Sequence, residues 1–429
     1  MEVGKMSIWQ EISSKKRAFW LFIPILLIYA CSYFQRTALP GTIYNTLVQE
    51  LGLNATQMAT LGASFIYTYA IFQLVSGAMV DRYCGARVVM AGGLIFITGT
   101  LIFPLCHSVF LLYLSRMLTG IGASAMYLSL VRETDRLFGR KNYAVFFGIA
   151  YFCGYGGGLM GSLPFERICQ HFPWRHVLLG AAVLGVIFYL FFLYGKRKVE
   201  LPPIPESRWS LKPFKYILGN PLSWLLIICS NVNFCTYFII QTVFGKKFLE
   251  DFAGYSSGNA AAVIFILTLI CMCTMLTASF LTRLTGNRRR PLVLSACGIC
   301  AGASILMTVS IFFNFSGWIF GVIYCLFAMA AGIPPIFAMV MQEINSRDIM
   351  AQAAAVCNMF GYLAVAICSQ LIGVLLDSFE KKILPSGTEI YSPEAYLTLF
   401  CVVSFVAVGS FIVAWMIPET KGHYLRLRI

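Results

Sequence analysis

One polar turn joins two long apolar runs: Gly77-Ala78-Met79-Val80-Asp81-Arg82-Tyr83-Cys84-Gly85-Ala86-Arg87. The turn contains a carboxylate, two guanidinium groups and two glycines. Because the apolar runs follow so closely on both sides, no folded domain fits between them. The stretch is therefore predicted to be a tight hairpin between two membrane helices. The side of the membrane on which it lies, and whether it recurs, decide the rest of the interpretation.

The composition places the whole chain in the membrane. Of its 429 residues 59% are hydrophobic and only 12% are charged, whereas soluble domains carry about 25% charged residues. A helix needs about 20 mostly apolar residues to cross a bilayer. Twelve runs fit this template, centred near residues 30, 68, 97, 120, 154, 185, 233, 270, 302, 329, 364 and 406. The fold class is predicted to be an all-α polytopic membrane protein with twelve transmembrane helices.

The net charge of +14 is concentrated in alternate loops. Basic residues precede the first run and follow each even-numbered run, while residues 43–56 carry none. This positive-inside asymmetry predicts that both termini are cytoplasmic, in a plasma (bacterial inner) membrane. It also explains the charge without a nucleic-acid partner.

The chain divides into two similar halves. Residues 196–221 form the longest polar segment, basic and rich in proline, and are predicted to link the halves. The second half repeats the opening turn at 278–288: adding 201 aligns Arg82, Gly85 and Arg87 with identical residues and Gly77 with Ala278, while the carboxylate of Asp81 is lost to Thr282. Such repeats are typical of transporters. The predicted domains are a lead-in at 1–18, a six-helix bundle at 19–195, the linker at 196–221, a second bundle at 222–417 and a tail at 418–429.

Charged residues inside the spans are candidate functional groups, because an arginine at the centre of a span costs about 2.5 kcal/mol or more. Arg36 in the first span is predicted to face a solute cavity; the alternative is an arginine that snorkels to the outer surface. At the inner end of the fourth span lie Arg132, Glu133, Arg136 and Arg140. They form either a solvated helix end or an ion-pair cluster that opens and closes during gating, with Arg132 reaching a cavity.

Small residues predict close helix packing. The fourth span contains Gly120 and Gly122 after Arg116, and the fifth contains Gly154 and Gly158 at the small-xxx-small spacing. The fifth-span glycines either pack against a neighbour or form a hinge. In the tenth span, a break in the helix is predicted at Gly332, Pro334 and Pro335.

The seventh span contains several polar side chains, notably Asn231, Tyr237 and Gln241. They are predicted to line a face toward a central site, although hydrogen bonds between helices would also account for them. The fifteen cysteines lie mostly in apolar runs and are expected to fill the core. The four histidines are scattered, so neither a metal site, a cofactor nor an enzyme is predicted.

These motifs resemble those of the major facilitator superfamily. Gly77, Asp81, Arg82, Gly85 and Arg87 are similar to the loop signature of that superfamily, and Arg116-xxx-Gly120-x-Gly122 resembles its fourth-span motif. Pro418-Glu419-Thr420-Lys421-Gly422 is similar to the ending of many members. The resemblance implies two six-helix bundles around a central cavity and alternating access, with the loop motif holding the cytoplasmic side closed in the outward-open state.

The first span and the residues before the second resemble the anion:cation symporter and organophosphate:phosphate antiporter branches. That resemblance implies a secondary active transporter of a small anionic organic solute, such as a carboxylate or phosphate ester. Arg36 and Arg132 would supply positive charge, and Tyr33, Asn231, Tyr237 and Gln241 would supply hydrogen bonds. The alternatives are a transporter-like sensor and a sugar or amino-acid transporter of the same fold. A monomer with a coupling ion (a proton, sodium or a counter-anion) is expected.

Overall fold

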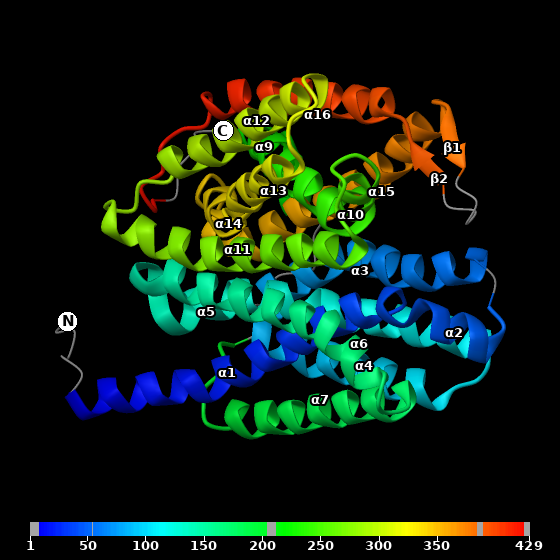
Figure 1. Cartoon of the computed structure of the whole chain (residues 1–429). Coiled ribbons are helices and arrows are strands. Elements are labelled where there is room, and N and C mark those ends of the chain that lie inside the picture. Colours follow the sequence, from blue (N-terminus) through cyan, green and yellow to red (C-terminus); the bar gives the residue numbers. More distant parts are fainter. Residues whose placement is uncertain (1–7, 54, 204–211, 384–388, 424–429) are drawn as a thin grey trace. The chain divides into compact units, whose positions relative to one another are not determined.

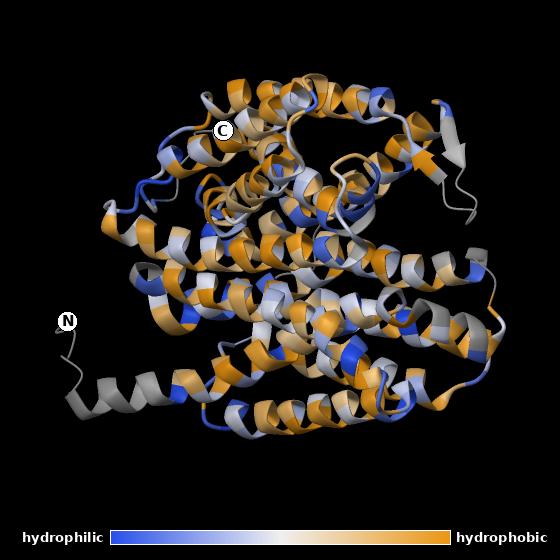
Figure 2. Ribbon diagram, in the orientation of Figure 1, coloured by the Kyte–Doolittle hydropathy of each residue, from blue (hydrophilic) through white to orange (hydrophobic). Residues whose placement is uncertain are grey.

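A computed structural model of the chain describes residues 8–53, 55–203, 212–383 and 389–423. These residues form helices almost throughout (Figure 1). Twelve segments are long and apolar enough to cross a membrane, so the predicted fold class is confirmed for the described residues. Figure 2 shows hydrophobic residues along most of the length of the helices, with hydrophilic residues concentrated toward helix ends and loops.

The chain separates into two compact units, residues 1–213 with 348–356 and residues 214–347 with 357–429. The division near residue 213 falls within the predicted linker, and the domain boundaries given above remain a prediction. Residues 1–7 of the predicted lead-in and 204–211 of the predicted linker lie outside the described residues. The lead-in and first span are one continuous helix from Ile8.

Unit 1 contains the helices of the first half. They are α1 (Ile8–Ala38), α2 (Tyr44–Leu51), α3 (Ala55–Tyr83), α4 (Gly85–Leu105), α5 (Val109–Met160), α6 (Leu163–Cys169) and α7 (Trp174–Lys196), with a 3₁₀ turn at Gly41–Ile43. α5 contains two spans that meet at Gly139, whose φ of 66° interrupts the helix. Glycine adopts this left-handed conformation without the penalty of a side chain.

Unit 2 contains most of the second half. Its elements are α8 (Lys212–Gly219), α9 (Pro221–Ile239), a π-helical turn (Ile240–Phe244), α10 (Gly245–Asp251), α11 (Ser257–Leu284), α12 (Arg290–Phe312), α13 (Gly317–Ala331), α14 (Pro334–Glu343) and α16 (Pro393–Ala414). After a 3₁₀ turn at Arg347–Ile349, α15 (Met350–Asp377) begins in the segment grouped with unit 1. Two short antiparallel strands, β1 (Lys381–Ile383) and β2 (Glu389–Tyr391), precede α16 and are absent from the sequence-based prediction.

The tenth span is broken where the sequence places glycine and proline. α13 ends at Ala331 and α14 begins at Pro334, so Gly332 lies between them. Pro334 and Pro335 occupy the first turn of α14, where a missing N–H costs nothing. The predicted hinge role of the break is a separate matter and remains a prediction.

α5 packs closely against three neighbours in unit 1. A Cβ on Gly122 would lie 2.4 Å from the backbone nitrogen of Phe96 in α4. A Cβ on Gly157 would lie 2.0 Å from the carbonyl oxygen of Ala30 in α1. At Gly120 the added atom would meet α3. No side chain fits at these distances, so the glycines allow the backbones of membrane helices to approach.

Candidate functional site

The inner turn between α3 and α4 binds the first turn of α15. Asp81 accepts hydrogen bonds from the backbone N–H groups of Ala351 (3.1 Å) and Gln352 (2.8 Å) through its two carboxylate oxygens. The first N–H groups of a helix have no partner within the helix, and they carry partial positive charge. Asp81 therefore caps α15. A Cβ on Gly77 would lie 2.8 Å from that of Ala355, so the missing side chain permits this approach.

The second half of the same motif contacts the side chain of Glu133. Its carboxylate accepts a hydrogen bond from the backbone N–H of Ala86 (3.0 Å), at the start of α4, and pairs with Arg136. A Cβ on Gly85 would lie 2.7 Å from the Glu133 side chain. Glu133 is fully buried. A buried carboxylate requires such partners because removing a charge from water is costly.

The basic residues of the motif extend this group toward residues 200–202. Arg87 donates to the carbonyl oxygens of Tyr83 (3.2 Å) and Pro202 (2.8 Å), and Arg136 donates to that of Glu200 (3.2 Å). The guanidinium of Arg82 lies 5.3 Å from the ring centroid of Tyr83.

Arg132, predicted to touch the solute, lies where its charge acts on the Asp81 carboxylate. Arg132 therefore lies close to the residues of the Gly77–Arg87 motif. The side chain of Arg140 lies outside the described residues.

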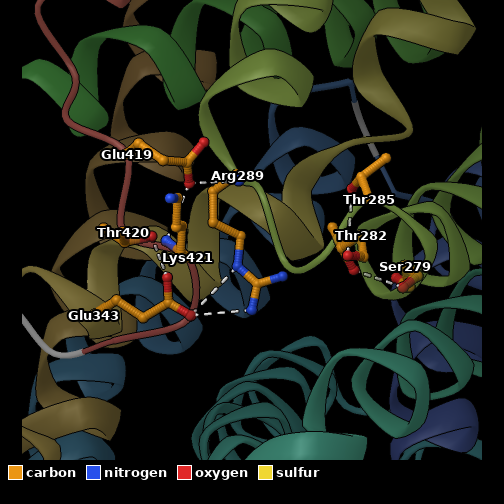
Figure 3. Close-up of polar contacts among 8 residues, drawn as sticks. All are labelled: Ser279, Thr282, Thr285, Arg289, Glu343, Glu419, Thr420 and Lys421. Carbon is orange, nitrogen blue, oxygen red and sulfur yellow. Dashed lines mark hydrogen bonds and ion pairs between the residues drawn. The ribbon is translucent and has the colours of Figure 1, made fainter.

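Unit 2 has a counterpart with different chemistry (Figure 3). Arg289 pairs with Glu343 (3.1 Å), and Glu343 also accepts from the Thr420 hydroxyl. The carboxylate of Glu419 accepts from the backbone N–H groups of Arg289 (2.8 Å) and Arg290 (3.2 Å), so it caps α12. The carboxylate that caps α12 thus comes from the segment after α16. In unit 1, the carboxylate at the start of α4 is that of Glu133 in α5.

Within the described part of the chain, Thr282, which replaces Asp81 in the repeat, caps no helix. Its hydroxyl donates to the carbonyl oxygen of Ser279 (2.7 Å) in its own helix, and Figure 3 shows it apart from the Arg289 group. The residue is fully buried. The two copies of the motif therefore differ in the described contacts as well as in sequence.

A group of tyrosines surrounds the predicted first-span site. Tyr29 donates to the hydroxyl of Tyr33 (3.2 Å), and the hydroxyls of Tyr127 and Tyr151 are 2.9 Å apart. The ring of Tyr155 lies 5.4 Å from that of Tyr33. We call these five residues of α1 and α5 the tyrosine group. Sequence reasoning singled out Tyr33 alone, although the i,i+4 spacing of the pairs Tyr29/Tyr33 and Tyr151/Tyr155 was a usable signal.

Arg36 extends the tyrosine group. Its guanidinium carbon lies 3.8 Å from the centroid of the Tyr33 ring, within the range of a cation–π interaction. The side chain is half-buried and lies within the span Arg17–Ala38. Another arginine within a span, Arg116, has a different environment: it is buried and donates to the carbonyl oxygens of Gln35 (3.0 Å) and Leu39 (2.9 Å). Those carbonyls end α1, where a cation is favourable.

The predicted residues of unit 2 do not gather in one place. Asn231 is nearly buried and lines an apolar cavity, Tyr237 is fully buried, and Gln241 donates to the hydroxyl of Thr268 (2.8 Å). Their predicted contact with solute remains a prediction. No group of three histidine, cysteine or carboxylate side chains able to hold a metal ion occurs among the described residues.

At the predicted outer end of unit 1, Glu50 joins three segments. It accepts hydrogen bonds from Trp174 and from Arg175 (2.8 Å), and Arg175 also donates to the carbonyl oxygens of Pro104 and Cys106. Partial burial raises the pKa of Glu50, but hydrogen bonds from Arg175 and Trp174 outweigh it, and the net effect lowers that pKa below its ordinary value. The group joins α2, the end of α4 and the start of α7.

Comparison with known proteins identifies relatives over most of the chain. The family model described as "Major Facilitator Superfamily" matches residues 25–369. The chain is 22% identical to the membrane sensor protein UhpC of Escherichia coli (strain K12), over 86% of this chain and 89% of that one. It is 23% identical to the human voltage-gated purine nucleotide uniporter SLC17A9 over 53% of this chain, and the match spans about half (55%) of that protein.

A solved structure supports the fold. The proton:xylose symporter XylE, bound to 6-bromo-6-deoxy-D-glucose, aligns with a TM-score of 0.71 over 96% of this chain and 98% of that one. The two sequences are 14% identical, so the likeness concerns the fold alone.

Proposed function

The chain belongs to the Major Facilitator Superfamily, whose members are transporters rather than enzymes, and from that membership we propose that it transports a small anionic organic solute by alternating access. The observation that carries the proposal is the position of Arg36, half-buried within a membrane span and stacked on Tyr33. A cation inside a span marks a functional site by default, because burying a charge in hydrocarbon is costly.

The chemistry of this site favours a carboxylate or phosphate. A guanidinium binds such groups through two parallel hydrogen bonds, and stacking on an aromatic ring holds its plane in one orientation. The tyrosine group adds hydroxyls that donate to anionic oxygens. SLC17A9 is named as a uniporter of purine nucleotides, which are phosphate-bearing anions, and this supports the same solute class.

The test begins with a thermal-shift screen of the purified protein against carboxylates, phosphate esters, sugars and amino acids. A solute that binds the folded state raises the melting temperature by mass action. Once the solute is known, Arg36→Lys is expected to weaken its binding about 10- to 100-fold, because a hydrogen bond to a charged group is worth about 1.5–3 kcal/mol. Arg197→Lys, at an exposed residue just after α7, is the matched control. Unchanged counterflow by Arg36→Lys in proteoliposomes would refute the role of Arg36.

We further propose that the contact of Asp81 with α15 forms and breaks during the transport cycle, with the motif on the cytoplasmic side. Its support is geometric: two charge-assisted hydrogen bonds join the α3–α4 turn to a helix start about 270 residues later.

We also propose that the protein lies in the plasma membrane with both termini in the cytoplasm. The proposed domain limits are 1–18, 19–195, 196–221, 222–417 and 418–429. Cysteine labelling from each side of sealed vesicles tests the orientation.

A second candidate function is favoured by one comparison. UhpC is named as a membrane sensor protein, and the match covers most of both chains. A sensor of this fold binds its solute without accumulating it. Net uptake into vesicles by the purified protein, measured with the solute that gives a thermal shift, separates the two functions: binding without flux would favour the sensor.

A further inference from the structure

Unit 2 contains a largely apolar cavity, lined at one point by Asn231, which is predicted to hydrogen-bond the solute. Its volume is about 570 Å³, and it is lined by α9, the π-helical turn, α10, α15, α16 and Tyr324 of α13. No charged side chain lines it. The hydroxyls of its two tyrosines, Tyr324 and Tyr396, already donate to Gly245 (3.0 Å) and to Asp251 (3.0 Å). A polar solute would find few partners there.

The cavity opens onto the apolar outer surface of the unit. Four of its lining residues, one on α9, one on α15 and two on α16, are also among the exposed large hydrophobic residues: Ile228 (43% exposed), Leu371 (62%), Val402 (51%) and Val406 (46%). In a membrane span, exposed apolar side chains of this kind face hydrocarbon. The opening therefore connects the cavity with the interior of the bilayer.

The dimensions fit a hydrocarbon chain. Along α15 the lining runs from Phe360 to Leu375, a length of about 22 Å at 1.5 Å per residue. One leaflet contributes about 15 Å of the hydrocarbon core, so the lining is long enough to contact an acyl chain of one leaflet along its whole depth. Apolar cavities of about 150 Å³ stay dry and take up apolar ligands, and an empty cavity forfeits the dispersion contacts of its walls.

We propose that this cavity binds an acyl chain of a membrane phospholipid, which fills the space between α15 and the helices α9 and α16. The chain enters through the opening at Leu371 and Val402, and its methylene groups contact the walls. The proposal rests on the volume, lining and opening of the cavity and not on the Arg36 site, and Asn231 is the lining residue that the two sites share.

The experiment uses the full-length protein in vesicles of phosphatidylcholine that contain a small fraction of phosphatidylcholine with a photoactivatable diazirine on one acyl chain. After irradiation, mass spectrometry locates the crosslinked peptides. We expect crosslinks concentrated at residues 360–375 and 396–406. Crosslinks spread evenly over all exposed apolar helices would overturn the proposal.

Two variants on α15 and α16 test the site directly. Ala364→Phe combined with Val403→Phe fills the cavity and should reduce these crosslinks to the level of other exposed helices. Val374→Phe is the matched control, since Val374 is 71% exposed on α15 and does not line the cavity. Crosslinking that survives in the filled variant, or falls equally in the control, would refute the assignment.

A second measurement needs no substitution, in case the filled variant does not fold. Cys235 and Cys368 line the cavity, whereas Cys273 and Cys401 are exposed and lie outside it. In detergent, added phosphatidylcholine should protect the first pair from a membrane-permeable maleimide and leave the second pair reactive. Equal protection of both pairs would contradict an acyl chain in the cavity. Displacement of the protection by a water-soluble anion would assign the space to solute instead.

Discussion

Replacing Asp81 with asparagine tests the contact that joins the first motif to α15. Asparagine keeps one acceptor oxygen and places an NH₂ group against the other backbone N–H. One of the two bonds, to Ala351 or to Gln352, is therefore lost, and the other loses its charge. Hydrogen bonds to charged groups contribute about 1.5–3 kcal/mol and neutral ones about 0.5–1.5 kcal/mol, so the contact should weaken by about 2.5–4.5 kcal/mol. At 1.4 kcal/mol per factor of ten, this is about 60- to 1,600-fold in the equilibrium of the contact.

Hydrogen exchange measures this effect without a known solute. In the peptide covering residues 348–356, the amides of Ala351 and Gln352 should exchange faster in Asp81→Asn by roughly the factor above, since their protection comes from that carboxylate. Counterflow, once a solute is known, should fall sharply in the same variant.

Thr282→Ala is the control, because that hydroxyl bonds only within its own helix among the described contacts. Its transport should change little and its exchange at 348–356 should not change. Equal loss of transport in both variants, or unchanged exchange in Asp81→Asn, would refute the assignment of the gate to the first copy.

Three further predictions concern stability. Gly122→Ala places a Cβ 2.4 Å from a backbone nitrogen of α4 and should cost about 1–3 kcal/mol; Gly180→Ala, with open space around it, should be neutral or stabilising in a denaturation series. The pKa of Glu50 is lowered, so its pairing with Arg175 stabilises the fold above the unfolded pKa of about 4.3, and this stabilisation is lost as pH falls through the folded pKa. Glu50→Gln should therefore reduce the drop in melting temperature that acid causes. A drop as large as in the unsubstituted protein would contradict this. Glu419→Gln should weaken the cap of α12 by about 0.5–2 kcal/mol, seen as faster amide exchange at residues 289–293, and unaltered exchange there would exclude the cap.

The spans were predictable because hydrocarbon leaves the backbone no choice but a helix. The positions of Gly122, Pro334 and Gly77 were predictable for a related reason: a residue without a side chain or without an N–H marks a close approach or a helix start. Neither inference requires knowledge of which distant segments meet.

The partners of the charged residues were less accessible to sequence reasoning. That Asp81 caps α15 and Glu419 caps α12 depends on contacts between residues about 270 and 130 positions apart. The tyrosine group was missed because hydroxyls buried in apolar spans look like ordinary core residues in a hydropathy profile. The contact of Arg132 with solute remains a prediction, and nothing in the sequence indicated that its charge also acts on the Asp81 carboxylate.

The distance in sequence between a helix start and its capping carboxylate decides when during synthesis the cap becomes available. α4 receives its cap from Glu133, 47 residues after Ala86, so this part of unit 1 has its partner soon after it is made. α12 must wait for Glu419, 130 residues after Arg289. During that interval the first N–H groups of α12 lack their carboxylate. In the nascent chain, the start of α12 therefore depends on other partners until the segment after α16 has been made.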